Sequence, residues 1–236
     1  MISEIEMKQQ NIIISGASGN LGRDVVRKLA DLGYGLNLTL GRHDAGTFNE
    51  LPNVYAKVVD LLNTDAANEF VSDSITKSES IQAGIFLAGG YAPGSVSETN
   101  DEDIEKMIQI NFLTAFHLVK PLMAHFEANG GGQFIFIGAR PALIAKQGAG
   151  NFAYALSKSL VFKMAEMINA EGESKNITAT VIVPSTIDTP TNRTAMPEAD
   201  FTKWIPTTDI AEGIAFVLSE TGKKMRQTVI KLYNQA

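Results

Sequence analysis

The stretch NIIISGASGNLGRDVVRKLADLG, residues 11–33, joins an apolar run to a glycine-rich turn and then to a helical pattern. The three consecutive isoleucines after Asn11 are typical of a strand that is buried on both faces. Gly16, Gly19 and Gly22 follow at G-x-x-G-x-x-G spacing, and the residues after them have the periodicity of an amphipathic helix. A strand that passes through a glycine turn into a helix predicts the first unit of a parallel α/β sheet.

Six more short apolar runs continue this pattern along the chain. They are residues 36–40, 55–60, 81–88, 133–138, 178–184 and 227–233. Longer helix-like segments alternate with the runs, and parallel strands require crossover connections of ~10 residues or more. We predict a doubly wound α/β domain, a Rossmann fold with a seven-stranded parallel sheet flanked by helices. No linker, repeat or low-complexity tract interrupts the chain, so we expect residues 1–236 to form a single domain.

Two long helical segments lie in the second half of the pattern. The first spans about 100–129, and we expect a kink near Pro121 because proline removes a helical hydrogen bond. The second spans about 151–170 and carries an apolar stripe, from which Tyr154 and Lys158 point largely away. The stripe consists of Phe152, Leu156, Leu160, Met164 and Met167. We expect the stripe to face the core, while the tyrosine and the lysine serve another purpose.

Composition excludes several classes of protein. The net charge of -6 provides no basic field for nucleic acid. The absence of cysteine excludes disulfides and thiolate metal sites, and the three histidines lack the spacing of metal ligands, so no metal is expected. The first ten residues lack the apolar core of a secretory signal, and no run reaches the ~18 apolar residues of a membrane span. We expect a cytoplasmic protein without a membrane partner.

The glycine turn indicates a cofactor. Between a buried strand and a helix, such a turn lets the backbone approach a pyrophosphate, whose charge meets free N–H groups and the positive end of the helix. Strand, turn and helix stand in the order that a dinucleotide requires, although a glycine-rich turn that binds nothing remains the alternative.

The end of the second apolar run indicates which dinucleotide is bound. NAD-binding chains commonly place a carboxylate there, but this run ends in Leu40, Gly41 and Arg42. A 2′-phosphate would meet a cation and no competing anion, which favours NADP(H), unless Arg42 is simply solvated. Two later strand ends, at residues 59–61 and 87–90, lie at the same carboxyl edge, where open parallel sheets bind ligands.

Tyr154 and Lys158 are four residues apart, so they share one helix face. With five tyrosines in the chain, this spacing alone could arise by chance. Together with the glycine turn, Asp60, the LAGG sequence at 87–90 and Asn111 within QINFLTAFHLVK, it makes the chain resemble the short-chain dehydrogenase/reductase family over nearly its whole length.

The resemblance implies that Tyr154 is the general acid/base and that Lys158 binds the nicotinamide ribose and lowers the pKa of the tyrosine. At ~5 Å and an effective dielectric of ~20 the attraction would be ~3 kcal/mol, or roughly two pKa units. The counterpart of Asn111 kinks a helix and holds a water in a proton relay, whereas an amide that caps local backbone is the alternative here. The catalytic residues expected are therefore Tyr154, Lys158 and Asn111.

The resemblance also supplies the cofactor-binding residues. VPSTIDTP at 183–190 is similar to the family's segment that contacts the nicotinamide amide, although Ser185 replaces the usual glycine. The expected cofactor-binding residues are Gly16, Ser18, Gly19, Asn20, Leu21, Gly22, Arg42, Asp60, Leu61, Ala88, Gly89, Gly90, Lys158, Pro184, Ile187 and Thr189. Residues 190–205 are expected to form a lid over the substrate. Family members are commonly tetramers built through the two long helices, so a homotetramer or homodimer is expected.

One departure from the family bears on the substrate. Most members have a serine after the fifth strand, but residues 138–154 contain neither serine nor threonine. The dihydropteridine reductase branch also lacks this serine, and residues 89–95 and 186–204 are similar to that branch. A quinonoid dihydropteridine needs only a proton on nitrogen, which Tyr154 supplies. Tyr91 and Trp204 are candidates to stack on such a flat substrate.

Arg42 stands against that branch, which usually carries an acidic residue there and prefers NADH. One alternative is an NADP-dependent reductase of an unrelated ketone or aldehyde, with Gln147, Asn151 or a backbone N–H in place of the serine. Another is an NADP-binding sensor without turnover. The Tyr-Lys pair favours catalysis, because a pure binder has no need of a phenol and an ammonium on one face.

Overall fold

The computed structural model describes residues 9–235, and its centre is one parallel sheet of seven strands in the order β3-β2-β1-β4-β5-β6-β9. Their bounds are β1 Asn11–Ser15, β2 Gly35–Leu40, β3 Val54–Val58, β4 Ala83–Phe86, β5 Gly132–Ile137, β6 Ile177–Pro184 and β9 Val229–Leu232. Each strand pairs with its neighbours in parallel. The predicted Rossmann arrangement and all seven strands are confirmed.

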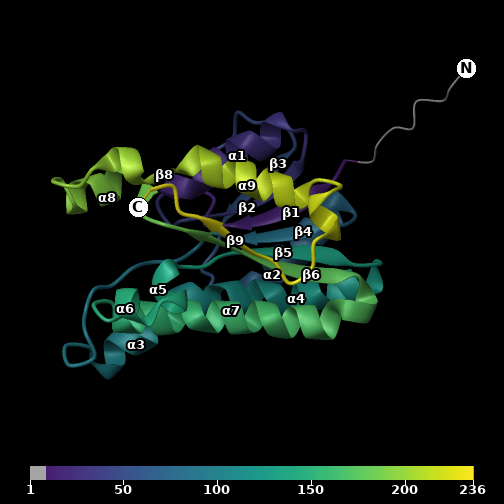
Figure 1. Cartoon of the computed structure of the whole chain (residues 1–236). Helices are drawn as coiled ribbons and strands as arrows, with labels where there is room; N and C mark the ends of the chain where they lie inside the picture. The colour runs from purple at the N-terminus through teal and green to yellow at the C-terminus, as the bar shows by residue number, and fades with distance from the viewer. Residues whose placement is uncertain (1–8, 236) are drawn as a thin grey trace, which may run out of the picture.

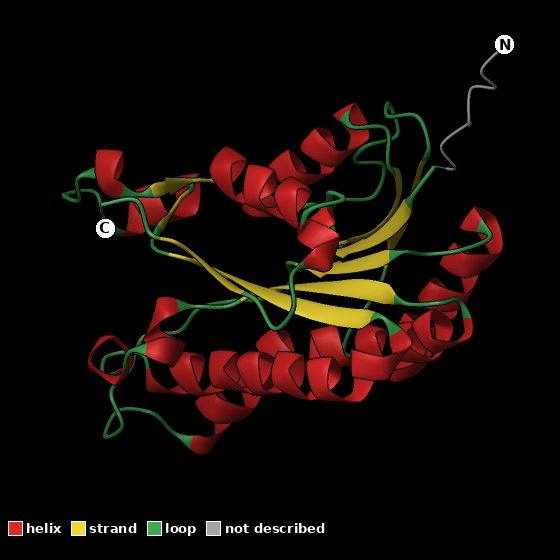
Figure 2. Cartoon of the chain, turned by 45° about the vertical axis from the view of Figure 1, so that its right-hand side comes forward, coloured by secondary structure: helices red, strands yellow, loops and turns green. Residues whose placement is uncertain are grey.

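Helices cover both faces of this sheet (Figure 1). On one face lie α1 Asn20–Asp31 and α9 Thr207–Leu218, which pack against each other; on the other lie α2 Thr64–Ser78, α4 Thr114–Ala128 and α7 Phe152–Gly172. Figure 2 shows the twisted sheet between these two layers. Ile12 and Ile14 belong to the core under α1, whereas Ile13 belongs to the core under α4 and α7. This division explains why β1 is apolar at successive positions.

The strand order reverses between β1 and β4, which is where open α/β sheets bind ligands at the carboxyl ends of the strands. Short elements gather around this edge, and Figure 1 shows α8 on one side of it and α5 and α6 on the other. They are α5 Arg140–Leu143, α6 Ala145–Gly148, the small strands β7 Ile187–Asp188 and β8 Ile205–Pro206, and α8 Pro190–Ala195. Elsewhere in the described chain, and not only at this edge, short 3-10 turns are formed by Glu173–Lys175, Phe201–Lys203 and Gly222–Lys224.

The first long helical segment is interrupted at a π segment that contains Asn111, whose family counterpart kinks a helix. Asn100 caps α3 Asp101–Ile108 in a capping box with Asp103, and a π-helical segment, Gln109–Leu113, then joins α3 to α4. Helix α4 continues through Pro121, so the helix does not end there, and the kink near this proline stays a prediction. A π segment inserts an extra residue into the helical turn and changes the direction of its side chains.

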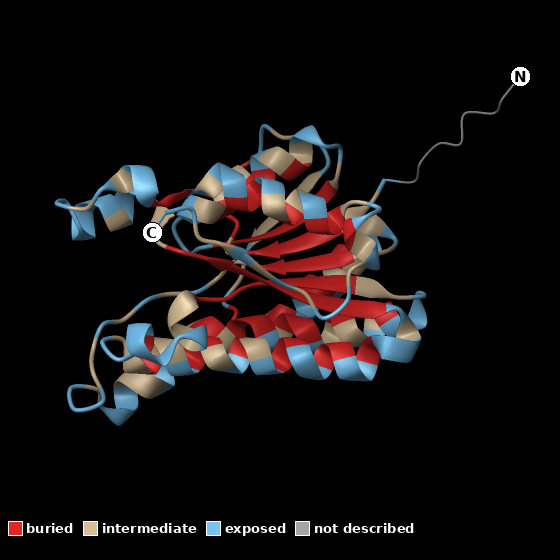
Figure 3. Cartoon of the chain, viewed as in Figure 1, coloured by how far each residue is buried: buried red, intermediate tan, exposed pale blue. Residues whose placement is uncertain are grey.

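The apolar stripe of α7 does not face the core, which corrects the second expectation. Leu156, Leu160 and Met167 are 41%, 37% and 64% exposed, although Met164 is buried. Figure 3 shows alternating exposed and buried residues along α7. The sheet is covered instead by the face that carries Val161 and the small or branched residues around it, because these approach the strands closely. Lys158 lies on the buried side of the helix.

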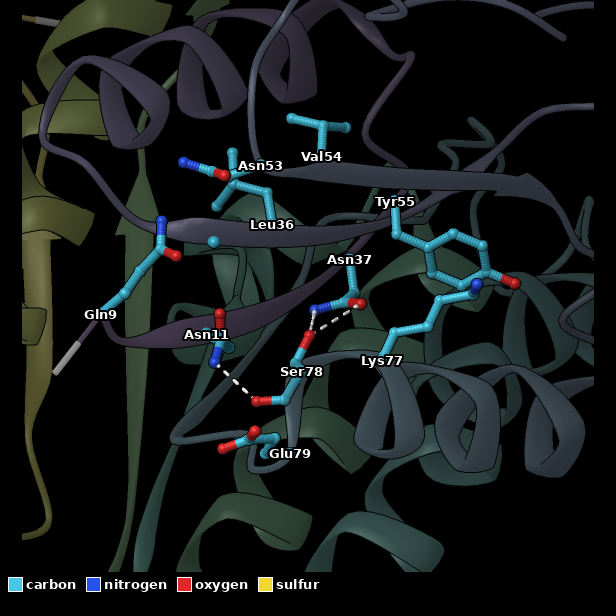
Figure 4. A pocket seen from close by; sticks show the side chains of 11 residues that line it. Gln9, Asn11, Leu36, Asn37, Asn53, Val54, Tyr55, Lys77, Ser78 and Glu79 are labelled. Carbon is cyan, nitrogen blue, oxygen red and sulfur yellow. Dashed lines mark hydrogen bonds between the residues drawn. The ribbon is translucent and has the colours of Figure 1, made fainter.

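A polar hollow of about 450 Å³ lies at the opposite, amino-terminal edge of the strands (Figure 4). Its polar groups bond to one another: Asn11 donates to the Ser78 carbonyl at 3.0 Å, and Asn37 donates to the Ser78 hydroxyl at 3.0 Å. Lys77 lies 4.8 Å from the centre of the Tyr55 ring. These contacts join the end of α2 to the starts of the strands, so we interpret the hollow as structural.

In residues 9–235, no helix is long and apolar enough to cross a membrane.

The tight start of α1 generates a stability prediction. A Cβ on Gly22 would lie 2.3 Å from the Gly16 carbonyl oxygen and 2.5 Å from that of Ala17, so Gly22→Ala must displace backbone. We expect a loss of about 3 kcal/mol in the free energy of unfolding, measured by urea denaturation. Gly150→Ala is the control, because no atom lies within 4 Å of its added Cβ. Equal stability of the two variants would contradict the argument.

Candidate active site

The glycine turn forms a cradle between β1 and α1. Gly16 has φ +68°, and a Cβ there would lie 2.6 Å from the Ala88 nitrogen, so only glycine fits against the chain that follows β4. Gly19 is the N-cap of α1 and has no side chain to satisfy the first N–H groups of the helix. These groups and the helix dipole are therefore available to an anion, which fits a cofactor pyrophosphate.

A cavity of about 310 Å³ lies beside this cradle. Five of the predicted cofactor-binding residues line it, namely Gly16, Arg42, Asp60, Leu61 and Ala88. The turn after β3 is held in place by the Asp60 carboxylate, which accepts the Leu62 N–H at 3.0 Å, and by His117, whose Nδ1 lies 2.8 Å from the Leu61 carbonyl. Val58 and Leu62 add exposed apolar surface to the wall. The cavity suits an adenosine that lies between apolar walls with Arg42 at the rim.

Lys158 lies buried under the other half of the carboxyl edge. Its side chain is only 7% exposed, and Nζ donates to the Ile137 carbonyl at 2.9 Å, at the end of β5. A Cβ on Gly89 would lie 3.5 Å from this Nζ and 2.6 Å from Asn111 Oδ1. Glycine at position 89 therefore lets the chain after β4 pass directly over both side chains.

Asn111 clamps the backbone of Gly90. Its Oδ1 accepts the Gly90 N–H at 3.0 Å, and its Nδ2 donates to the Gly90 carbonyl at 3.0 Å and to the Ser157 hydroxyl at 3.1 Å. Because Asn111 sits in the π segment, it connects the loop after β4 to α7 at the turn before Lys158. This geometry agrees with an amide that caps local backbone, and the role in a proton relay stays a prediction.

The two ionisable groups have pKa values that move in opposite directions. Burial lowers the pKa of Lys158 to about 8, because the ammonium is removed from water. Burial also raises the pKa of Tyr154 to about 12, and Tyr91 adds to the rise. The sequence predicted a pKa of Tyr154 lowered by the lysine charge, but here burial and Tyr91 raise this pKa.

Tyr91 stands directly beside Tyr154. Backbone hydrogen bonds from Gly94 N to Gly150 O at 2.9 Å and from Phe152 N to Gly94 O at 2.8 Å tie the loop after β4 to the start of α7. The Tyr91 and Tyr154 rings meet edge to face with their centres 5.1 Å apart, and Tyr91 is 62% exposed. Sequence reasoning considered Tyr91 only as a stacking surface and missed this contact, which depends on the two backbone hydrogen bonds.

Trp204 lies elsewhere. It is 6% exposed and packs on Phe201 with ring centres 4.8 Å apart. Its indole is therefore part of the small core of the segment 190–205 and is not an exposed stacking surface. Of the two aromatic residues suggested by the sequence, the structure brings only Tyr91 to Tyr154.

The segment after β6 is tied to the glycine cradle. The Thr189 hydroxyl accepts the Asn192 N–H at 3.2 Å, and Asn192 Nδ2 donates to the Ile187 carbonyl at 2.8 Å. Asn20 Nδ2, at the start of α1, donates to the Thr191 hydroxyl at 3.1 Å. The expected lid at 190–205 thus meets the glycine cradle at Thr191, and Ile187 and Thr189 are bonded to the neighbouring Asn192, whereas Pro184 ends β6 beside β9.

One expectation at the rim is wrong. The sequence indicated no anion beside Arg42, but the Asp44 carboxylate turns back onto the glycine loop and accepts the Ser18 hydroxyl at 2.8 Å. This residue was missed because it follows the apolar run by four positions, and only the turn after β2 brings it back.

Comparison with known proteins agrees with this geometry. Residues 10–200 match the family described as short chain dehydrogenase. The chain belongs to this family.

Two relatives and two solved structures illustrate its position in the family. The dihydropteridine reductase of Dictyostelium discoideum is 31% identical over 215 residues, covering 86% of this chain and 85% of that protein. The 3-oxoacyl-[acyl-carrier-protein] reductase MabA of Mycobacterium tuberculosis is 28% identical over 185 residues, covering 78% of this chain and 72% of that protein. The structure described as ElxO with NADP bound has a TM-score of 0.85 at 20% identity, covering 95% of this chain and 97% of that one. The crystal structure of gox2181 has a TM-score of 0.87 at 20% identity, with coverages of 96% and 95%.

Membership identifies the chain as an oxidoreductase family member that uses a nicotinamide cofactor. The glycine cradle fits the pyrophosphate, and the cavity lined by Arg42 and Asp60 fits the adenosine. When bound, the cofactor supplies or accepts the hydride.

The buried ammonium of Lys158 generates a prediction about stability and pH. A pKa lowered by about two to three units corresponds to ~3 kcal/mol against the charged form, offset by ~1 kcal/mol for the bond to Ile137. We expect Lys158→Met to raise the free energy of unfolding at pH 7 by about 2 kcal/mol.

The advantage of this variant is expected to shrink as pH rises. Between about pH 8 and 10.5 the unfolded chain keeps the lysine proton that the folded wild type has lost, so wild-type stability rises with pH in this window. Urea denaturation at pH 7 and pH 9.5 measures the difference, with the exposed Lys146→Met as the charge-matched control. A stability difference that does not change with pH would contradict the assignment.

Proposed function

We propose that this protein is an NADP(H)-dependent reductase that transfers a hydride to a conjugated or carbonyl substrate, with a quinonoid dihydropteridine as the first candidate and Tyr154 as the proton donor. The observation that carries the proposal is a neutral, partly buried phenol in a site whose β5-α7 connection, residues 138–154, offers no serine or threonine hydroxyl. Similarity to the dihydropteridine reductase of Dictyostelium discoideum supports the substrate class.

The proton chemistry follows from the state of Tyr154. With its pKa raised to about 12, the phenol keeps its proton at neutral pH and is set to act as an acid. When the substrate ring accepts a hydride, the electron pair displaced onto a ring nitrogen takes the proton from the phenol oxygen. The Lys158 ammonium, held on the same helix face, then stabilises the phenolate that is left.

The shape of the site supports a flat, conjugated acceptor. A ketone needs a donor to polarise its carbonyl oxygen, and loss of such a donor costs roughly 3 kcal/mol of transition-state stabilisation. An electron-poor ring does not depend on that donor. The exposed Tyr91 ring, edge to face with Tyr154, offers an aromatic wall against which the substrate can stack.

The preference for NADP(H) rests on Arg42, which is exposed at the rim of the adenosine cavity. A guanidinium pairs well with a phosphate at the 2′ position. Similarity to the MabA reductase supports a second candidate, reduction of a ketone, in which another group replaces the missing serine.

Substitution of the proton donor tests the proposal. We expect Tyr154→Phe to lower kcat for NADPH oxidation by a quinonoid dihydropteridine at least ~100-fold, because general acid catalysis contributes that much or more. The dissociation constant of NADPH should change less than about twofold. Absorbance at 340 nm follows the reaction, and Tyr34→Phe, far from the carboxyl edge, is the control. Binding of NADPH without turnover of pterins or ketones would support a sensor instead.

We also propose that the protein forms a homodimer or homotetramer through the outer faces of α4 and α7. Between these helices lies an apolar groove of about 610 Å³, at which Phe116, Leu160 and Met167 are exposed. Lys120, Lys163, Glu127 and Glu171 also line the groove, so two copies related by a two-fold axis would match opposite charges. The apolar stripe of α7, which was expected to face the core, would then be buried between two copies of the chain.

Light scattering tests this assembly. The wild-type mass is expected to be two or four times 25.4 kDa, and Leu160→Glu is expected to give a monomer because a carboxylate would be buried without a partner. Leu32→Glu places the same charge at the exposed apolar residue that follows α1 and should leave the mass unchanged. A monomeric wild type would contradict the proposal.

A further inference from the structure

The turn after β2 fills a place that Gly41 leaves vacant. A Cβ on Gly41 would lie 2.8 Å from Oδ2 of Asp44 and 3.6 Å from the Ser18 hydroxyl. The carboxylate of Asp44 therefore occupies the space that a side chain at position 41 would enter. Position 41 is where dinucleotide-binding chains commonly carry the acidic residue that bonds the ribose 2′-hydroxyl.

Two contacts, from Ser18 and Arg23, hold this carboxylate directly, and three more hold the groups around it. The Asp44 N–H donates to the Gly41 carbonyl at 3.0 Å, which closes the turn. The Ser18 hydroxyl donates to Asp44 Oδ2 at 2.8 Å and accepts the Gly41 N–H at 3.1 Å. Arg23 Nη2 lies 3.6 Å from Asp44 Oδ1, and Arg23 Nε donates to the Ser18 carbonyl at 3.0 Å. The carboxylate is thus fixed to both the glycine loop and the end of β2.

The carboxylate lies against Gly41, which lines the cofactor cavity. The Asp44 side chain is 36% exposed, and Gly41 and Arg42 both line the cavity. A ribose bound beside Gly41 would lie near both the anion of Asp44 and the cation of Arg42, the residue that follows Gly41. Because a hydroxyl can donate to a carboxylate whereas a phosphate dianion is repelled by it, the two groups favour different dinucleotides.

We propose that Asp44 is a determinant of cofactor specificity: it accepts the ribose 2′-hydroxyl of NAD(H) and weakens binding of the 2′-phosphate of NADP(H) that Arg42 favours. The protein then uses both dinucleotides, with a preference set by two opposed charges. This inference rests on the proposed function, because it concerns the same adenosine cavity.

Dissociation constants of NADPH and NADH, measured by calorimetry without substrate, test the assignment. Asp44→Asn keeps the shape of the side chain and removes its charge. We expect the NADPH dissociation constant to fall roughly fivefold and the NADH constant to rise roughly fivefold, as the loss of one charge-assisted interaction implies. Adenosine 2′,5′-bisphosphate and adenosine 5′-monophosphate should show the same opposite shifts, because they carry only the adenosine end.

Control variants separate the effect of the Asp44 charge on binding from that of the Arg42 charge. Asp31→Asn makes the same change in net charge at the exposed far end of α1 and should leave all four constants within about twofold. Arg42→Ala should raise the dissociation constant of NADPH without raising that of NADH. Circular dichroism confirms that each variant is folded.

The outcomes distinguish this inference from the proposed function. Suppose that the wild type binds NADPH but the dissociation constants of Asp44→Asn are unchanged, or shift in the same direction for both dinucleotides. This result overturns the role of Asp44 and leaves the proposed function standing. Wild type that binds neither dinucleotide overturns both proposals. Opposite shifts in the variant, present also with the two adenosine fragments, support the inference whatever the substrate proves to be.

Discussion

The site depends on the close approach of backbone to backbone where β1, β4 and α1 meet. Gly16 packs against Ala88, and Gly22 packs against the carbonyl of Gly16, at separations that exclude any Cβ. These contacts fix the direction of α1 and leave its first N–H groups at the carboxyl edge of the sheet. The chain after β4 is held in the same way, because Gly89 passes over Lys158 while Asn111 clamps Gly90. Phosphate cradle and proton donor are thus positioned by one continuous backbone contact.

Burial sets the chemistry at the nicotinamide end. Removing Tyr154 and Lys158 from water shifts both toward their neutral forms, so the phenol retains its proton and the ammonium becomes easier to discharge. A buried lysine with one backbone acceptor costs stability. Under the proposed function, it is retained for the charge that it supplies once Tyr154 has donated its proton. At Lys158, the buried charge that the proposed reaction uses lowers the stability of the fold.

The sequence was sufficient to predict the sheet and the glycine cradle, because both depend on the local pattern of residues. Apolar runs such as 11–15 mark strands buried on both faces, and glycine spacing marks a turn between strand and helix. Features that depend on tertiary contact were not accessible: Asp44 reaches Ser18 only through a turn, and the stripe through Leu160 could not be distinguished from the face through Val161, since both are apolar. The interruption at Asn111 was indicated only by the family resemblance, because a π segment has no strong residue signature of its own, whereas a proline such as Pro121 has one.

The two ends of the cofactor-binding edge differ in how they are built. The nicotinamide end is made of buried groups locked by backbone hydrogen bonds, so a change there disturbs packing as well as reactivity. The adenosine rim is made of half-exposed charges on a turn, where Arg42 and Asp44 can be exchanged at little cost to stability. Substitutions at the rim are therefore expected to disturb the fold less than substitutions of Lys158 or Asn111, because only these two side chains are buried in the core.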